Sequence, residues 1–553
     1  MKKLFLSLIL LGFYSFSFSQ TINDSIKKKI DELFVKWDNP SSPGCAIGIV
    51  RNDSLIYAKG YGMANLENNI PITPETKFYM ASVSKQFTGY CIVLLARQGK
   101  VKLDEDVHIY LPWVPDFGNK ITVRNLLNHT SGLRDDIDLS LICGLGGDGM
   151  LTQSLALNII KRQRYLNFEP GKQYQYSNSN FVLLAEIVKS VSGQSLKSFA
   201  DSAIFKPLGM NHTLFLDDYT QLLQNRAYSY SKVDNTAFAN NFQNVYTLGD
   251  GGLFSNITDI KKWVTNFYSP KAGDSRDIEQ LTQKGMLNNG KEISYALGIR
   301  VNTYKGWKRY THTGSLAGYR NYIAIYPDLK IGIIVFSNLD NPTPRDMVSK
   351  LTDLFIKDTS TIKQAIVDSN VSVLTNTDNF KKFYGNYLSN DGVEFNFALR
   401  NQKLYWEANA NSILLVKKSN NTFINSQDSS IRFVFSDIDT KKKLVTQYLP
   451  DNVRLLTKYT IDNSQTEQEL RTYTSLYYSP ELDCNYGITL KGRQLILTSS
   501  NYQDSELKYL GKDELFNKNG LGHLQIIRSK QNKVIGFEMD NGSIMNLRFN
   551  KIE

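Results

Sequence analysis

The stretch FYMASVSKQFTGYCIVLLAR, residues 78–97, decides the fold. A short apolar segment, residues 78–80, runs directly into a predicted helix over residues 82–97. The helix opens with Ser82-Val83-Ser84-Lys85, a Ser-x-x-Lys pattern. Apolar side chains recur at helical spacing along one face, at Phe87, Cys91, Leu94 and Leu95. The stretch therefore combines a helix suited to a core with reactive side chains at its start.

The chemistry of Ser-x-x-Lys follows from that helix. A serine at a helix start lies beside free backbone N–H groups, and one of these can stabilise an oxyanion. The spacing of three places Lys85 on the same face as Ser82, where a partly desolvated lysine can accept the serine proton. The pattern alone is weak evidence for a catalytic pair, because a helix-capping serine followed by a surface lysine gives the same sequence. It also begins at Ser25, Ser229, Ser360 and Ser505.

A second motif is Tyr176-Ser177-Asn178. A tyrosine beside a lysine can pass a proton between a nucleophile and a leaving group. The Asn178 amide can offer both a donor and an acceptor to a substrate amide. The alternative is a loop tyrosine followed by capping residues, since a helix is predicted over residues 180–191.

A third motif, His312-Thr313-Gly314, opens a late pair of predicted strands. Glycine at a strand edge lets the backbone approach a ligand closely, and the N–H of Ser315 can supply a second oxyanion donor. We expect His312 to donate to a substrate carboxylate or to the Tyr176 oxygen. Asn178, Thr313, Gly314 and Ser315 are the predicted substrate-binding residues. The alternative for His312 is a histidine satisfied within a turn.

In this order, the three motifs resemble a known family of serine hydrolases: class C β-lactamases, DD-peptidases, D-stereospecific aminopeptidases and related esterases. The resemblance covers residues 25 to 360, and short flanking segments add to it. They are GKVKLD at 99–104, LLNHTSGL at 126–133, GDGGL at 249–253 and YPD at 326–328.

The resemblance implies acyl transfer without a metal or another cofactor. Ser82 would attack a carbonyl, Lys85 and Tyr176 would handle protons, and water would release the acyl-enzyme. His129 falls in a loop that this family uses structurally. The third motif has His312 where β-lactamases usually carry lysine, whereas DD-peptidases, D-aminopeptidases and esterases of the family use histidine there. Efficient β-lactam hydrolysis is therefore disfavoured.

The expected function is hydrolysis of a small peptide, amide or ester, with D-amino-acid peptides such as cell-wall fragments as the leading substrates. A carboxylesterase or weak β-lactamase, and a catalytically silent penicillin-binding or sensing protein, stay open as alternatives.

The order of predicted elements gives an α+β fold. Strands at residues 45–50 and 55–59 precede many helices, and strands at 322–326 and 331–337 follow them. We expect the early and late strands to share one antiparallel sheet, flanked by helices and joined by a helical subdomain, as in a β-lactamase/transpeptidase-like catalytic domain. This domain is assigned to residues 20–360 and is followed by a polar linker, residues 361–378.

The remaining chain is predicted to be all-β and internally repeated. Segment 383–387 recurs loosely at 473–477, 403–406 at 494–497, and 431–435 at 524–528, at a nearly constant offset. The two repeats, 379–462 and 466–553, are expected to form lipocalin-like barrels or sandwiches. Two unrelated β segments are the alternative.

The N-terminus predicts export. Lys2-Lys3 precedes an apolar run over residues 4–16, and Ser17 and Ser19 supply small residues before a cleavage point. Residues 1–19 are therefore predicted to be a signal peptide, too short to span a membrane, with a periplasmic or secreted product that keeps no stable membrane span.

The length and composition of the chain limit the number of domains and the kinds of partner that are expected. A chain of 553 residues exceeds what one hydrophobic core supports. The net charge is +11, but the basic residues are scattered among 53 acids, so no nucleic-acid partner is expected. Weak attraction to a cell-wall polymer stays open. The five histidines and four cysteines show no metal-binding spacing. One disulfide is allowed in an oxidising compartment, although the spacing does not establish it.

Overall fold

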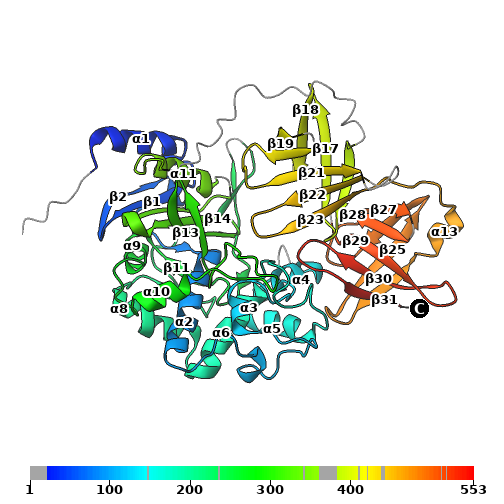
Figure 1. Ribbon diagram of the computed structural model, residues 1–553, viewed down its shortest axis with the longest axis horizontal. Coiled ribbons are helices and arrows are strands. Elements are labelled where there is room, and N and C mark those ends of the chain that lie inside the picture. Colours follow the sequence, from blue (N-terminus) through cyan, green and yellow to red (C-terminus); the bar gives the residue numbers. More distant parts are fainter. Residues whose placement is uncertain are drawn as a thin grey trace, which may run out of the picture.

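A computed structural model gives the structure of the chain. It describes residues 22–145, 149–234, 237–340, 343–359, 383–408, 411–419, 421–437, 443–511, 513–518 and 520–552. The predicted signal peptide, 1–19, and the predicted linker, 361–378, lie outside the described residues. Three units are visible in Figure 1: a large mixed domain in blue to green, a barrel in yellow and a second barrel in orange to red.

The large domain is built on a six-stranded antiparallel sheet in the order β12-β13-β14-β15-β1-β2. Its early strand β1 pairs with its late strand β15, with Cys45 opposite Ser337. The prediction that early and late segments share one sheet is confirmed. The strands are β1 (Cys45–Arg51), β2 (Ser54–Tyr61), β12 (Arg300–Tyr304), β13 (Trp307–Leu316), β14 (Tyr319–Tyr326) and β15 (Ile331–Ser337).

Both faces of this sheet are buried, because successive side chains point to opposite sides of a strand. Ile47 packs in one cluster with α1 (Asp24–Phe34) and α11 (Pro344–Asp353). Its neighbour Ala46 belongs to the cluster on the other face, which includes residues of α2 (Lys85–Arg97) and α9 (Ile257–Asn266). Burying a side chain of the size of Ile47 contributes about 1.5–3 kcal/mol to the stability of the fold.

The central helix α2 is where the sequence predicted it, but its start differs. Residues Ala81–Ser84 form a 3₁₀ turn, and the α-helix begins only at Lys85. All residues from Lys85 to Leu95 are buried, so this helix is enclosed by the domain on every side. That position explains its apolar composition.

The predicted helical subdomain packs around α2 and α6 (Figure 1). None of the helices in the described part of the chain has the length and apolar character needed to cross a bilayer. The further helices are α3 (Val123–Leu127), α4 (Asp136–Ile142), α5 (Gln153–Arg162), α6 (Ser179–Ser192), α7 (Leu196–Ala200), α8 (Lys206–Leu208) and α10 (Ser275–Leu281). Short strands complete the domain: β3 (Met63–Asn65), β4 (Ile70–Pro71), β5 (Phe78–Tyr79), β6 (Leu151–Thr152), β7 (Leu214–Phe215), β8 (Tyr230–Lys232), β9 (Phe238–Asn240), β10 (Val245–Tyr246) and β11 (Leu253–Ser255).

The tail consists of two closed eight-stranded barrels, so the barrel alternative holds and the sandwich alternative does not. Barrel one comprises β16 (Gly385–Ser389), β17 (Glu394–Arg400), β18 (Lys403–Ala408), β19 (Asn411–Ser419), β20 (Thr422–Asn425), β21 (Arg432–Asp437), β22 (Lys443–Tyr448) and β23 (Val453–Lys458). Barrel two follows the short helix α13 (Glu467–Arg471). It comprises β24 (Ser475–Ser479), β25 (Cys484–Lys491), β26 (Gln494–Thr498), β27 (Ser505–Gly511), β28 (Glu514–Asn517), β29 (Gly522–Arg528), β30 (Val534–Asp540) and β31 (Leu547–Ile552).

The barrels repeat each other strand for strand, which confirms the predicted duplication. Tyr387 in the first strand of barrel one donates its hydroxyl to the carbonyl of Phe383, at 3.1 Å. The aligned Tyr477 in barrel two donates in the same way to the carbonyl of Tyr473, at 2.6 Å. Closing each sheet into a barrel removes the exposed strand edges that an open sheet would present.

Barrel two is attached to the large domain by a buried ion pair. The Arg134 guanidinium donates to Glu481 Oε2 at 2.7 Å, and the two side chains are 0% and 1% exposed. The same guanidinium also donates to the carbonyl oxygens of Met545 and Asn546, at 2.8 and 3.0 Å. Glu481, Met545 and Asn546 all lie in barrel two. Arg134 therefore depends on barrel two for most of its hydrogen-bond acceptors.

We predict that Glu481→Gln destabilises the protein by about 3 kcal/mol, because it leaves a buried guanidinium without a countercharge. Urea unfolding would measure the loss. The matched control is Asp483→Asn, which removes the charge from an exposed pair with Arg162 at 3.5 Å and should cost less than about 1 kcal/mol. Equal effects of the two variants would contradict the importance of the buried pair.

Candidate active site

Ser82 lies in the 3₁₀ turn that precedes α2. The residue before it, Ala81, has a φ of 48°, a left-handed conformation that costs a non-glycine residue about 1–2 kcal/mol. The turn is held in place because Met80 N donates to the carbonyl of Leu253 at 2.8 Å. Ser82 is partly exposed, whereas Val83 and Ser84 are buried. The strained turn therefore presents Ser82 to solvent at the surface of an otherwise enclosed segment.

Lys85 is completely buried and makes three hydrogen bonds. Its Nζ donates to Ser82 Oγ at 3.1 Å, to Asn178 Oδ1 at 2.8 Å and to the carbonyl of Asp250 at 2.7 Å. An ammonium has three donors, whereas a neutral amine has two and a lone pair. When Lys85 is neutral, Asn178 and Asp250 can take both N–H groups, and the lone pair then points to Ser82. The arrangement can thus place a base against the Ser82 hydroxyl.

The protonation of Lys85 is set by two opposing effects. Burial lowers its pKa from 10.5, and the negative charges of Asp250, Asp135 and Asp136 raise it. Burial prevails, and the pKa of Lys85 falls to about 8. A lysine with this pKa is neutral in a useful fraction of molecules near neutral pH, and it can therefore accept a proton.

A glycine turn brings the Asp250 carbonyl to Lys85. Gly249, with a φ of +98°, lies against α6: a Cβ there would approach the carbonyl oxygen of Phe181 to 2.2 Å. Only glycine fits both this conformation and this spacing. The GDGGL segment quoted from the sequence therefore supplies a lysine acceptor, a role the sequence did not reveal.

Asn178 is held from behind by Asp135. The carboxylate oxygen Oδ2 accepts from Asn178 N at 2.6 Å and from Asn178 Nδ2 at 2.9 Å. These bonds fix the orientation of the amide, so that its oxygen faces Lys85. We expected both ends of the Asn178 amide to be offered to a substrate. Instead its amide joins Lys85 to Asp135 within the protein.

Tyr176 completes the group around the nucleophile. The Tyr176 side chain lies beside Ser82, which lowers its pKa slightly against the effect of burial, and Lys85 Nζ lies 4.9 Å from the centre of the tyrosine ring. Burial raises the pKa of Tyr176 well above its ordinary value, so this side chain is a phenol and not a phenolate. Lys85 is therefore the better proton acceptor of the two, and Tyr176 is suited to relay a proton.

His129 positions Tyr176, in agreement with the structural role expected for its loop. The two rings lie 4.2 Å apart between their centres. His129 Nδ1 accepts from Ser177 N at 3.2 Å and lies 3.1 Å from Asn180 Nδ2. Burial lowers the pKa of His129 well below its ordinary value, so the ring packs as a neutral aromatic group.

His312 lies at the site, but its partners differ from those predicted. Its Nδ1 is 2.6 Å from the carbonyl oxygen of Thr313, which can only accept, so Nδ1 carries the hydrogen. Its Nε2 therefore accepts from the Tyr295 hydroxyl, at 2.7 Å. In this arrangement neither ring nitrogen donates to Tyr176, whereas the expected donation to a substrate carboxylate stays a prediction. Burial lowers the pKa of His312 to about 3.

The strand that carries His312 runs beside the nucleophile turn. Strand β12 pairs with β13 only as far as Thr311, which leaves the edge of residues 312–316 uncovered by β12. A Cβ on Gly314 would approach the carbonyl oxygen of Met80 to 2.1 Å, so glycine is required for this close approach. Thr313 and Ser315 are exposed on one side of the strand. Their substrate-binding roles, and the Ser315 N–H as an oxyanion donor, stay predictions.

Both barrels reach the neighbourhood of this site. Asp451, between β22 and β23 of barrel one, accepts from Ser294 N at 2.7 Å and from Arg300 at 2.9 Å. Arg300 also donates to the Tyr174 hydroxyl at 2.8 Å and lies over the ring of Tyr295, the partner of His312. Barrel one is thus connected to His312 through Arg300 and Tyr295.

Barrel two approaches the Tyr176 segment through its β30–β31 loop. The carbonyl of Gly542 accepts from Gln175 Nε2 at 2.5 Å, and that of Ser543 accepts from Asn167 Nδ2 at 2.7 Å. Gln175 directly precedes Tyr176 in the sequence. The loop therefore fixes the start of the second motif.

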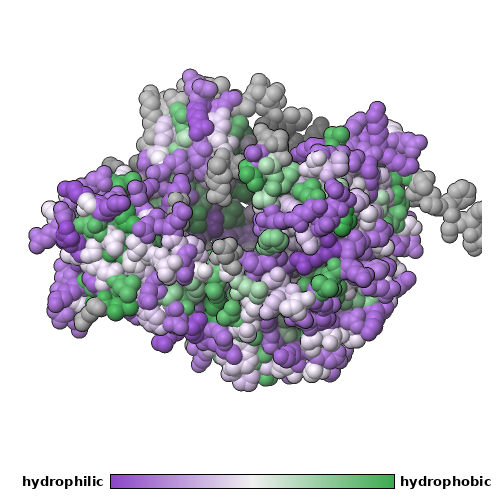
Figure 2. Space-filling model, turned by 180° about the vertical axis from the view of Figure 1, so that it is seen from behind, coloured by the Kyte–Doolittle hydropathy of each residue, from purple (hydrophilic) through white to green (hydrophobic). Residues whose placement is uncertain are grey.

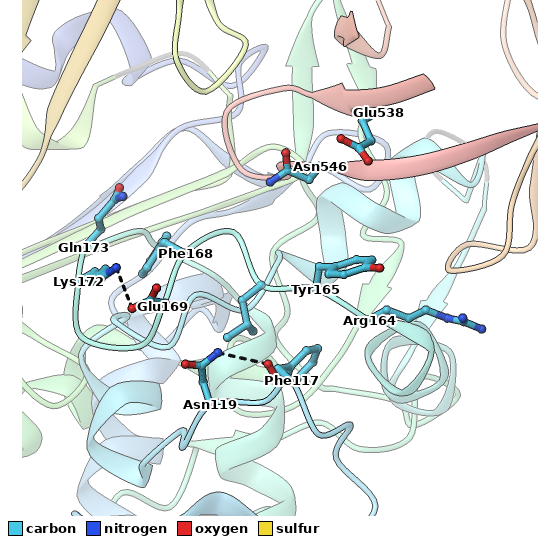
Figure 3. A pocket seen from close by; sticks show the side chains of 11 residues that line it. Phe117, Asn119, Arg164, Tyr165, Phe168, Glu169, Lys172, Gln173, Glu538 and Asn546 are labelled. Carbon is cyan, nitrogen blue, oxygen red and sulfur yellow. Dashed lines mark hydrogen bonds and ion pairs between the residues drawn. The ribbon is translucent and has the colours of Figure 1, made fainter. Parts of the chain in front are cut away.

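A pocket of about 610 Å³ lies where barrel two meets the large domain. In Figure 3, Glu538 and Asn546 of barrel two lie above it, and Tyr165 and Phe168 of the large domain lie below. Ser82, Lys85 and His312 do not line it, so the pocket is separate from the nucleophile. Figure 2 shows a largely hydrophilic surface that is hollowed near the centre of the molecule.

The structure thus brings together Ser82, Lys85 and Asn178 in one hydrogen-bonded group, and it places Tyr176, His312 and Gly314 beside them. Sequence reasoning gave no role to Asp135, Tyr295, Arg300 or Asp451. Asp135 lies two residues after the quoted LLNHTSGL segment. Its place beside this segment was the available indication of a role at the site. The other three come from separate segments, and no spacing in the sequence connects them.

Comparisons with known proteins agree with this geometry. The sequence profile of the Beta-lactamase family matches residues 30–354. The D-aminopeptidase of Brucella canis is 30% identical over 303 residues, which make up 55% of this chain and 57% of that protein. The chain therefore matches only a little more than half the length of these curated relatives.

Solved structures show the same fold. An octameric penicillin-binding protein homologue from Pyrococcus abyssi has a TM-score of 0.55 at 24% identity, covering 78% of this chain and 99% of that one. A D-amino acid amidase from Ochrobactrum anthropi SV3, in complex with L-phenylalanine amide, has a TM-score of 0.50 at 20% identity, covering 60% of this chain and 98% of that one.

The fold and the contact between Ser82 and Lys85 define the class, a serine protein of the β-lactamase fold. The family match spans more than half of the sequence, and the chain belongs to the Beta-lactamase family.

We predict that acylation of Ser82 depends on pH through Lys85. Below the lysine pKa of about 8, the rate should fall about tenfold for each pH unit, because protonated Lys85 cannot accept the serine proton. His312, whose pKa is about 3, should add no step near neutral pH. The rate of inactivation by a fluorophosphonate, measured from about pH 5 to about pH 10, would show this.

The control for this pH profile is Tyr176→Phe. Removing the phenol should lower the rate but leave the midpoint of the acidic limb in place. If the limb disappears in Tyr176→Phe, then Tyr176 and not Lys85 is the base.

Proposed function

We propose that the protein is an exported serine hydrolase that works through an acyl-enzyme on Ser82. Its substrates are amides or small peptides with D-amino-acid residues, such as cell-wall fragments. The observation that carries the proposal is the buried Lys85, which is bonded to Ser82 Oγ and to two fixed acceptors. A site of this kind deprotonates a serine without a metal.

The first half-reaction follows from these contacts. Ser82 Oγ attacks the carbonyl carbon, and its proton passes to the neutral amine of Lys85. Negative charge then develops on the carbonyl oxygen. The backbone N–H of Ser82, in the strained turn, and that of Ser315, on the uncovered edge of β13, are the proposed donors to that oxygen.

Acylation is completed when the leaving group receives a proton. Tyr176 is a phenol beside Ser82 and Lys85, so it can pass a proton from the Lys85 side to the departing amine. Loss of the amine leaves an ester on Ser82. Water, activated by the same Lys85–Tyr176 pair, then hydrolyses that ester and restores the serine.

Two findings support amides over β-lactams. A curated relative of the chain is the D-aminopeptidase of Brucella canis. The neutral His312 offers neither a charge nor a free donor to the carboxylate that a β-lactam carries beside its scissile bond. Esters fit the same machinery and stay the second candidate, since they have a better leaving group. The charged and apolar N-terminal residues 2–16 support export.

We predict that D-amino-acid amides are hydrolysed at least about tenfold faster than their L enantiomers. Ser82→Ala should lower the rate by about 10³-fold or more, because the nucleophile is lost. Steady-state rates on a panel of D-amides, L-amides, short acyl esters and a β-lactam would measure both effects. Ser25→Ala is the matched control, because Ser25 begins another Ser-x-x-Lys but is exposed on α1.

Faster turnover of esters than of every amide would favour the carboxylesterase. Full activity of Ser82→Ala would refute the proposal. The remaining alternative is a catalytically silent binding or sensing protein. It is tested by the intact mass after fluorophosphonate treatment, because such a protein would form no adduct.

A further inference from the structure

Two of the four cysteines meet at the boundary between the large domain and barrel two. Cys143 follows the last residue of α4, and Cys484 is the first residue of β25. The two thiols interact closely enough to shift each other's pKa, downward for Cys143 and upward for Cys484. The Cys143 thiol donates in turn to the carbonyl of Leu482, at 3.6 Å. The Cys143 side chain therefore crosses the domain boundary and meets the segment of barrel two that leads into Cys484.

The backbone around this pair is held from both sides. Asn501 Nδ2 of barrel two donates to the carbonyl of Cys143 at 3.0 Å. The Tyr486 hydroxyl, two residues after Cys484, donates to the carbonyl of Ile142 at 2.9 Å. The Tyr502 hydroxyl donates to the carbonyl of Leu141. Three side chains of barrel two thus bind the last residues of α4, which fixes the two cysteines relative to each other.

The other two cysteines differ in their surroundings. Cys45 in β1 and Cys91 in α2 are 0% exposed. Burial raises the pKa of both thiols, which makes them unreactive. Cys143 and Cys484 are partly exposed. The nearby Cys484 thiol lowers the pKa of Cys143, and the positive charge of Arg162 acts in the same direction. Cys143 is therefore the better nucleophile of the pair.

We propose that Cys143 and Cys484 form a disulfide that links the large domain to barrel two. The oxidant is another disulfide, either a small molecule or a protein. The Cys143 thiolate attacks one sulfur of that disulfide and releases one thiolate. Cys484, after losing its proton, attacks the Cys143 sulfur and releases the second thiolate. The two cysteines lose two protons and two electrons in total, and the oxidant is reduced to two thiols.

The bridge would fix the position of barrel two beside the active site. Asp135, the N-cap of α4, holds Asn178, and Cys143 lies at the other end of the same helix. The bridge would join residues that are 341 positions apart, from the numbers 484 and 143. A covalent link across so long a stretch restricts the unfolded chain strongly. The proposal is independent of the substrate of the enzyme.

The test uses the full-length protein equilibrated with oxidised glutathione, then denatured and treated with N-ethylmaleimide. We expect a mass lower by about 2 Da before labelling and only two maleimide additions, on Cys45 and Cys91. Peptide mapping should recover the segments around Cys143 and Cys484 as one linked species. The Tm should rise by about 5 °C relative to the reduced protein.

Cys484→Ser is the control variant, because it removes one sulfur at the boundary and keeps a small polar side chain. In this variant the Tm should be the same with oxidised and with reduced glutathione. Four maleimide additions to the parent protein, or a bridge that involves Cys45 or Cys91, would overturn the proposal. An equal Tm of the oxidised and reduced parent would show that the bridge does not fix barrel two.

Discussion

The complete burial of Lys85 is the constraint on which the active site depends. A buried amine needs an acceptor for each N–H, and the protein supplies them from three distant segments: Ser82, Asn178 and the carbonyl of Asp250. Each acceptor is fixed in turn. Asp135 orients Asn178, a glycine turn presents Asp250, and the strained residue Ala81 places Ser82. The same burial lowers the pKa of Lys85 to about 8, so the interaction that organises the site also makes it reactive.

The barrels extend this organisation beyond the large domain. Barrel one places Asp451 on Arg300, which lies over Tyr295, and Tyr295 is hydrogen-bonded to Nε2 of His312. Barrel two supplies Glu481 to the buried Arg134, the residue directly before Asp135. The second and third motifs of the large domain are thus each supported from a different barrel. Such contacts hold functional side chains in position without touching a substrate.

The sequence predicts the parts of this structure that depend on local spacing. Lys85 falls on the same face as Ser82 because a helical turn has a fixed length, and the bond between their side chains follows from it. The barrels are also predictable from local spacing. Alternating apolar and polar residues mark the strands, and the two repeats align with each other at a nearly constant offset. What the sequence does not show are pairings across the chain. Nothing in the residues around Asp451 or Glu481 indicates a partner in another domain, and the partner of His312 Nε2 is Tyr295, seventeen residues away.

The state of His312 narrows the chemistry that the site can perform. A lysine in this position would carry a positive charge into the cleft, but His312 is neutral, with Nδ1–H directed to Thr313 and Nε2 occupied by Tyr295. Neighbouring cations do not replace that charge. Arg300 is paired with Asp451, and Arg320 donates to the carbonyls of Ala317 and Tyr319. Lys85 itself is enclosed. A substrate with a carboxylate beside its scissile bond would lose water there without gaining a partner, whereas a neutral amide or ester would not. The third motif therefore adds no positive charge beside Ser82.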